Sequence, residues 1–349
     1  MGMLDRHFDE IFGGGAVLQL TGAQARSSRE WIQSKIVAVD IENVAKWFYE
    51  ENDQEYWDWR EDFPTQISPW PLAWYEWPQP EFYLMGEKRE ASFREAGVVK
   101  TGVSVCCLRV SDKHRSMPGM HPFLGAAQHL WQKMYGAGAR LSSQLVNRAS
   151  EPVSGAHWLA GYQVFVETAR KDLFWLGMVC DYLDADGKPI IEWRQVVNNA
   201  QNVLYELSGR RLDDETIERL AQMGDLVTGE LLPLAFAISL LHCKNTTVQI
   251  QEVPERLQKA RQRRGRPPLF RYHVLEIEPM RRILRSEGRS HETGLRRAMH
   301  ICRGHFKDYR ERGLFGKETH KGIYWWDMHV RGSAKDGVVV KDYTVKAPV

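Results

Sequence analysis

Two runs of β-forming residues set the strongest limit on the fold of this chain. The first covers residues 98–110, and the second covers residues 157–193, in which residues 162–168 alternate between apolar and polar side chains. Runs rich in β-branched and aromatic residues are typical of strands. Asp186-Gly187 stands between two apolar runs, which is typical of a hairpin with a capped turn. The sequence therefore predicts two sets of strands in this part of the chain.

Three other segments have the spacing or composition of helices. Apolar residues recur at helical spacing within residues 28–51, and acidic residues open a helical pattern at residue 213. Residues 231–241 are the most apolar segment, too short to cross a bilayer and typical of a buried core helix. We therefore predict an α+β fold of mixed strands and helices with a basic, β-rich C-terminal module.

Charge divides the chain unevenly. Residues 256–346 hold 23 Lys and Arg against 10 Asp and Glu, although the whole chain of 349 residues carries a net charge of only +2. We predict an acidic, aromatic-rich α+β region over residues 1–250 and a basic β-rich module over residues 251–349, and the two may be separate or share one core. Seven of the 13 Trp lie in residues 31–77, which predicts a core packed with indole rings or, as the alternative, a face for another protein.

Period-two geometry predicts a basic face in the C-terminal module. If residues 301–307 are extended, Arg303, His305 and Lys307 point to one side, and in residues 324–331 His329 and Arg331 share a side. If the two strands pair with these faces matched, the five basic side chains converge. Such a patch suits phosphate groups.

A second basic cluster precedes these strands. Arg263, Arg264 and Arg266 surround a glycine, and the Arg264-Gly-Arg-Pro267 core resembles that of an AT-hook, which lies in the minor groove of DNA. An ordinary basic loop is the alternative. In either case we expect these three residues to join the predicted nucleic-acid-binding set, whose members are Arg263, Arg264, Arg266, Arg303, His305, Lys307, His329 and Arg331.

Three functions compete on this evidence. The first is nucleic-acid binding, to DNA or RNA, through the basic face. The second is a metal-independent nuclease in which His305 and His329 act as general base and acid. The third is a protein-binding modulator or a structural component. No cofactor and no metal site are expected, because an extended chain puts His300 and His305 on opposite faces and the five cysteines form no CxxC pair.

The C-terminal residues also carry a resemblance. His300-Ile-Cys-Arg-Gly-His-Phe-Lys-Asp-Tyr309, with Leu314-Phe-Gly316, Tyr324-Trp-Trp326 and His329-Val-Arg-Gly332, is similar to a family of uncharacterised bacteriophage and prophage proteins. The likeness covers mainly residues 236–345. It implies a phage-related origin and a cytoplasmic location in a bacterial host cell, and it carries over no activity. In that setting the structural alternative is a phage component, and the partner of the aromatic-rich region is a host or phage protein. No membrane partner is expected, because the sequence holds no run of 18 or more apolar residues.

Overall fold

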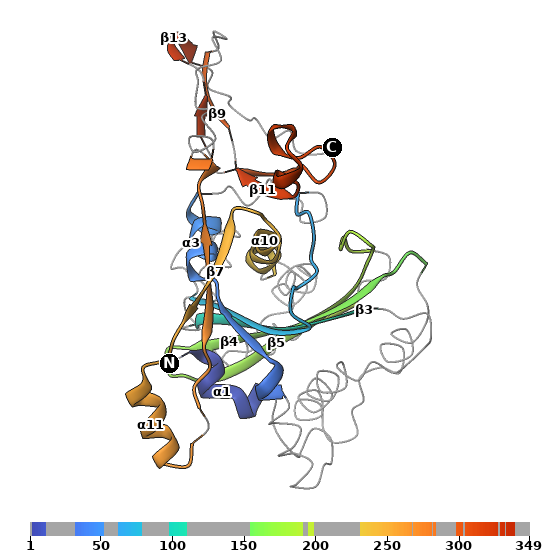
Figure 1. Ribbon diagram of the computed structural model, residues 1–349. Helices are drawn as coiled ribbons and strands as arrows, with labels where there is room; N and C mark the ends of the chain where they lie inside the picture. The colour runs from blue at the N-terminus through green and yellow to red at the C-terminus, as the bar shows by residue number, and fades with distance from the viewer. Residues whose placement is uncertain are drawn as a thin grey trace, which may run out of the picture. The chain divides into compact units, whose positions relative to one another are not determined.

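The structure of this protein is a computed structural model. The described residues are 2–11, 32–51, 62–78, 98–109, 154–190, 195–198, 231–266, 268–280, 282–283, 298–302, 304–326, 329–331 and 333–338. They confirm the predicted α+β class (Figure 1). The chain divides into a first unit of residues 1–241 and 248–275 and a second unit of residues 242–247 and 276–349. The first unit thus includes residues 251–275, which the charge pattern had assigned to the C-terminal module.

The first unit is built on an eight-stranded mixed sheet with the order β6-β5-β4-β3-β2-β1-β8-β7. Its strands are β1 (Val37–Asp40), β2 (Leu72–Pro78), β3 (Val98–Arg109), β4 (Trp158–Thr168), β5 (Leu173–Leu183), β6 (Gln195–Asn198), β7 (Thr246–Gln251) and β8 (Tyr272–Ile277). β1 runs parallel to both β2 and β8, whereas the pairs from β2 through β6 are antiparallel.

The predicted β-forming runs become β3, β4 and β5, the longest strands of the sheet. The turn after β5 is capped as predicted. The Asp184 carboxylate accepts hydrogen bonds from the amides of Asp186 and Lys188, each at 2.9 Å. Gly187 takes a φ of 85°, which is the left-handed conformation that glycine adopts without steric cost.

The helical prediction for residues 28–51 is wrong in its centre. Residues 37–40 form strand β1, which separates a short helical segment at residues 32–35 from helix α3 (Glu42–Glu51). Ala38 and Val39 are both buried, because β1 lies inside the sheet between β2 and β8. A strand that is covered on both faces has no apolar–polar alternation, so its apolar run cannot be told from helical spacing.

Helices cover both faces of the sheet (Figure 1). Helix α1 (Met3–Ile11) packs Met3, Leu4 and Phe8 into a core cluster that includes Trp74 and Phe165. On the other face lie α3 and α10 (Leu232–Leu241), whose Phe236 ring lies 5.8 Å from that of Phe48 and 6.1 Å from that of Phe63. The prediction of a core helix at residues 231–241 is confirmed, and no helix in the described residues has the length and apolar character needed to span a membrane.

The packed-core interpretation of the tryptophan-rich segment holds for strand β2, whereas Trp70, just before it, is only half-buried. Trp74 and Trp77 of β2 have no exposed surface. Residues 52–61, with Trp57 and Trp59, lie outside the described part of the chain, as does the helix predicted from residue 213.

The second unit is small and rich in short strands. Its elements are β9 (Ala298–Cys302), β10 (His305–Asp308), η3 (Leu314–Gly316), η4 (Glu318–His320), β11 (Ile323–Trp326), β12 (His329–Arg331) and β13 (Ser333–Val338). Its core holds Met280, Leu314, Tyr324 and Trp326. Buried Asn245 connects three segments of the second unit. Its side chain donates to the carbonyls of Glu278 and Trp325 and accepts from the Trp325 amide, each at 2.9 Å.

Candidate nucleic-acid interface

A basic arm connects β7 to β8 and carries three of the predicted nucleic-acid-binding residues. We define it as residues 252–271, which contain seven Lys and Arg and two Glu. At its centre is helix α11 (Glu255–Arg263), which has no buried residue and stands away from the sheet in Figure 1. Arg263, Arg264 and Arg266 are all exposed. A helix with no buried residue gains little stability from packing, which is typical of a helix whose charged side chains face solvent.

The orientation of α11 is set by one glutamine. The Gln258 side chain donates to the carbonyl of Leu269 and accepts from its amide, each at 2.9 Å, as a neighbouring strand would. Arg256, Lys259 and Arg263 are three and four residues apart, so they share one face of the helix, away from Gln258. Lys259 pairs with Glu255 at 2.7 Å, an exposed pair that leaves the stripe net positive.

The glycine of the AT-hook-like core has a capping role. Gly265 has a φ of 64°, its amide donates to the Gln262 carbonyl at 3.0 Å, and the Arg266 amide donates to the Arg261 carbonyl at 3.0 Å. These two bonds form a Schellman motif, which ends a helix with glycine in the left-handed conformation. Arg264 and Arg266 therefore flank a folded helix end, and the alternative of a basic loop fits better than the resemblance to an AT-hook.

The return segment of the arm is fastened to α1. The Phe270 amide donates to Asp5 at 2.8 Å, and the rings of Phe270 and Phe8 lie 5.4 Å apart. Tyr272, the first residue of β8, donates its hydroxyl to Glu76 at 3.0 Å. The arm is thus exposed along its helix and anchored at its C-terminal end.

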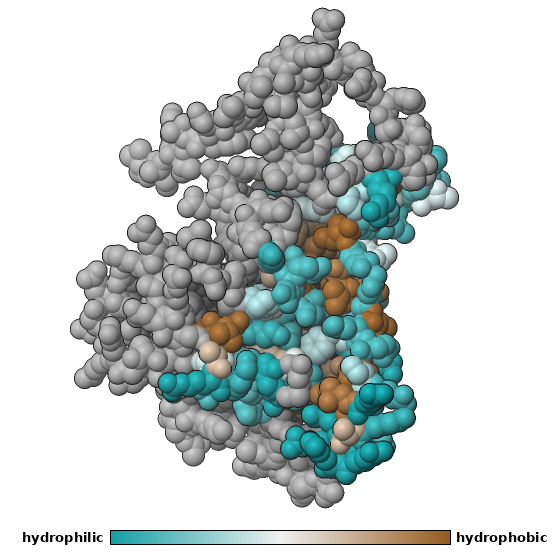
Figure 2. All heavy atoms as spheres, turned by 90° about the vertical axis from the view of Figure 1, so that its left-hand side faces the viewer, coloured by the Kyte–Doolittle hydropathy of each residue, from teal (hydrophilic) through white to brown (hydrophobic). Residues whose placement is uncertain are grey.

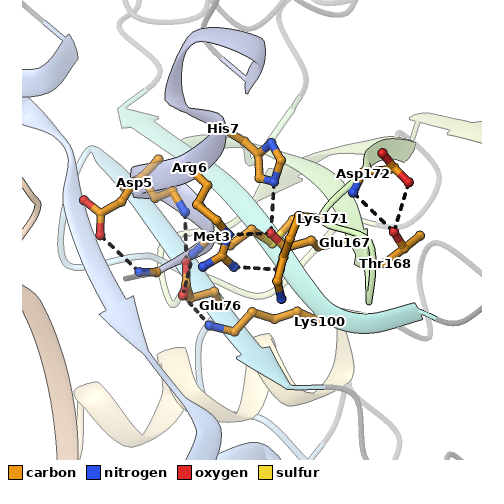
Figure 3. Close-up of polar contacts among 12 residues, drawn as sticks. Met3, Asp5, Arg6, His7, Glu76, Lys100, Glu167, Thr168, Lys171 and Asp172 are labelled. Carbon is orange, nitrogen blue, oxygen red and sulfur yellow. Dashed lines mark hydrogen bonds and ion pairs between the residues drawn. The ribbon is translucent and has the colours of Figure 1, made fainter. Parts of the chain in front are cut away.

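Glu76 is the centre of a buried polar network (Figure 3). Its carboxylate accepts hydrogen bonds from the amides of Met3 and Leu4 at 3.0 and 3.1 Å, and it also pairs with Lys100. The Trp74 indole donates to it at 2.8 Å. The two amides belong to the first turn of α1, where unpaired N–H groups and the helix dipole favour a negative charge.

Glu167 forms the second part of this network, at the end of β4. Arg6 donates to both of its oxygens, at 2.7 and 2.6 Å, and the His7 ring lies 2.9 Å from one of them. The side chain of Glu167 is 1% exposed, whereas Lys171, 3.6 Å away, is largely exposed. Two buried carboxylates thus hold successive residues of α1 against the sheet, and each is fully supplied with donors, as a structural role requires.

The two carboxylates have lowered pKa values. Burial would raise the pKa of Glu76, but the charge of Lys100 and the hydrogen bonds from Lys100, Trp74 and Met3 outweigh it. Burial would also raise the pKa of Glu167, and the hydrogen bonds and charge of Arg6 together with His7 outweigh it. Asp5 differs, because burial is the stronger effect there and its pKa is raised.

Acid is therefore expected to destabilise the first unit. A carboxylate with a lowered folded-state pKa contributes stability that is complete above its unfolded pKa, near 4.5 for glutamate, and is lost as pH falls through the folded-state value. Asp5 reduces this pH dependence in part, because its pKa is raised in the folded state. Urea unfolding at a series of pH values between about 7 and 2.5 measures it, and Glu76→Gln should reduce the maximum slope by up to about 1.4 kcal/mol per pH unit. An unchanged slope in that variant would contradict the assignment.

The predicted convergence of the histidines is wrong. It required odd-numbered residues of the two strands to lie opposite one another, whereas β10 and β11 pair His305 with Trp326 and Lys307 with Tyr324. β9 and β12 pair His329 with Cys302, three residues before His305. A register that differs by one residue moves a whole set of side chains to the other face, and the sequence alone did not determine that register.

Two side chains of this ladder, those of His305 and Lys307, pack against Trp326 in the core of the second unit. The His305 ring stacks on Trp326 with 6.5 Å between centroids, and the Lys307 ammonium lies 4.2 Å from the centre of the same indole. Both side chains are half-buried. Arg331 is paired with His300 in the backbone ladder, and Arg303 lies outside the described residues. The roles of Arg303, His305, Lys307, His329 and Arg331 in nucleic-acid binding stay predictions.

Sequence reasoning missed Glu76 and Glu167, although a signal was present. Each is an acidic residue inside a run of strand-forming residues, Leu72–Pro78 and Trp158–Thr168. A carboxylate in such a run must find donors when the strand is buried. Comparison with known proteins adds no assignment, because no family model, no curated protein and no solved structure matches the chain.

Proposed function

We propose that this chain is a phage-related nucleic-acid-binding protein that acts in the cytoplasm of a bacterial host, and that its basic arm is the primary contact with the phosphate backbone. The observation that carries the proposal is the exposure of α11, a helix with no buried residue in which arginine and lysine outnumber glutamate. Phosphate neutralisation by such side chains provides most of the affinity of sequence-independent binding.

Three features of the arm support this role. The outward stripe of Arg256, Lys259 and Arg263 continues into Arg264 and Arg266 at the helix end. Gln258 and Phe270 hold the arm in one orientation, which limits the entropy lost on binding. The Schellman motif fixes the directions in which Arg264 and Arg266 leave the helix. Helix stability alone would explain only the basic residues of the last turn, because the positive charges of Arg261 and Arg263 interact favourably with the negative end of the helix dipole.

Salt dependence tests the proposal. Five phosphate contacts, one each by Arg256, Lys259, Arg263, Arg264 and Arg266, predict that log K falls with log salt at a slope of about −4.5 on duplex DNA and about −3.5 on a single strand. Raising the salt from about 50 to about 200 mM should then weaken duplex binding roughly 500-fold. Fluorescence anisotropy with labelled duplex and single-stranded DNA and RNA measures the slope and identifies the preferred nucleic acid.

Variants that remove charge from the arm or from elsewhere on the first unit show which surface binds nucleic acid. Changing Arg263, Arg264 and Arg266 together to Gln should reduce the duplex slope to about −1.8. The matched control changes Lys35, Lys46 and Arg170 to Gln, which removes the same charge from exposed positions of the first unit outside the arm. Absent binding at low salt would end the proposal, and a slope reduced by the control but not by the arm variant would assign binding to another surface.

A further inference from the structure

Among the residues that the structure describes, strand β7 forms one edge of the sheet. It ends the strand order, and its residues 247–251 are all exposed. Val248 is 39% exposed and Ile250 is 52% exposed, two of the few large apolar side chains at the described surface. Figure 2, which views the molecule from the side of Figure 1 on which β7 and α11 are drawn, shows apolar patches among hydrophilic residues.

Edge strands of monomeric proteins usually carry devices that block pairing with another chain. Lysine side chains, proline and β-bulges are the common ones. β7 has the sequence Thr-Thr-Val-Gln-Ile-Gln, with no charge, proline or glycine. Its backbone groups and its β-branched side chains are therefore available to a further strand.

We propose that β7 pairs with β7 of a second copy of this chain, antiparallel and about a two-fold axis at Gln249. In that register Val248 lies opposite the partner's Ile250, and Ile250 lies opposite the partner's Val248. Gln249 faces the partner's Gln249, and Thr247 faces the partner's Gln251. Apolar residues meet apolar residues and polar residues meet polar ones, as the isologous contact of a two-fold dimer requires.

Charge selects the antiparallel arrangement of two copies. Each β7 leads directly into a basic arm, whose residues include seven Lys and Arg and two Glu. Antiparallel pairing puts the two arms at opposite ends of a joint strand about 20 Å long, beyond the Debye length at physiological salt. Parallel pairing would put them side by side, where they repel. The self-complementary pattern and the uncharged strand between basic arms thus favour a second copy over an unrelated peptide.

Sedimentation velocity of nuclease-treated full-length protein tests the pairing without nucleic acid to bridge two copies. We expect a concentration-dependent dimer, and Val248→Lys or Ile250→Lys should raise its dissociation constant at least tenfold. The matched control is Val196→Lys, because Val196 is 40% exposed on β6 at the other edge of the sheet. A wild-type protein that stays monomeric at about 100 µM, a concentration far above the dissociation constants of specific dimers, would overturn the proposal.

A cysteine placed on the axis tests the register. Gln249→Cys should form an intermolecular disulfide under mild oxidation, because directly opposed residues have Cα atoms within the range that a disulfide spans. Val196→Cys is the control for random collision. Equal cross-linking of both variants would reject the register. Dimerisation that persists in both lysine variants would reject β7 as the interface, and neither outcome bears on nucleic-acid binding by the arm.

Discussion

Replacing Glu76 with alanine is expected to lower the free energy of unfolding of the first unit by about 3–5 kcal/mol. The carboxylate is 1% exposed and accepts hydrogen bonds from two amides of α1, the Trp74 indole, the Tyr272 hydroxyl and Lys100. Alanine leaves all five donors without this acceptor, and most of them cannot reach water. Urea unfolding followed by circular dichroism measures the loss.

Two further variants test whether the loss of stability comes from the buried carboxylate of Glu76. Glu76→Gln keeps the shape and one acceptor oxygen, so its effect should be smaller than that of alanine. Glu42→Ala removes an exposed carboxylate from α3 and should change stability by no more than about 0.5 kcal/mol. If Glu76→Ala were no more harmful than Glu42→Ala, the network would not hold α1 in place.

Replacing Asn245 with alanine should destabilise the second unit by about 2–4 kcal/mol. Asn245 is 2% exposed, and its amide group satisfies both backbone groups of Trp325 and the carbonyl of Glu278. Alanine removes all three bonds and fills none of the space. Hydrogen exchange in peptides that cover residues 242–247 and 305–326 reports the loss directly.

The matched control for Asn245 is Thr319→Ala, an exposed position of η4 in the same unit. It should leave exchange in these peptides unchanged. Equal protection in Asn245→Ala and Thr319→Ala would show that the second unit does not depend on this side chain.

Local chemistry made part of the fold predictable. β3, β4 and β5 consist of β-forming residues, and Asp184 and Gly187 determine the turn that follows. β1 was not predictable, because its burial depends on β2 and β8, which are distant in the sequence. Tertiary context overrides local periodicity at such a strand.

The sequence predicted which basic residues belong to the candidate interface, but it did not predict how they are arranged. Arg263, Arg264 and Arg266 were identified from composition, and all three are exposed at the end of helix α11 or just after it. That Gly265 ends this helix depends on two backbone bonds that the Arg-Gly-Arg sequence does not specify. The pairing of His305 with Trp326 likewise depends on a register set by the whole ladder.

The parallel contact of β1 with β8 has a consequence for synthesis. The His273 ring bonds the Ala38 carbonyl across 235 residues, and the Phe270 amide bonds Asp5 across 265. A ribosome releases β1 and α1 long before it releases β8, whereas β3, β4 and β5 follow one another closely in the chain. Contacts of such long range form late in folding. The emerging chain therefore presents an open β1 edge to the cell for most of the time that its first unit is being made.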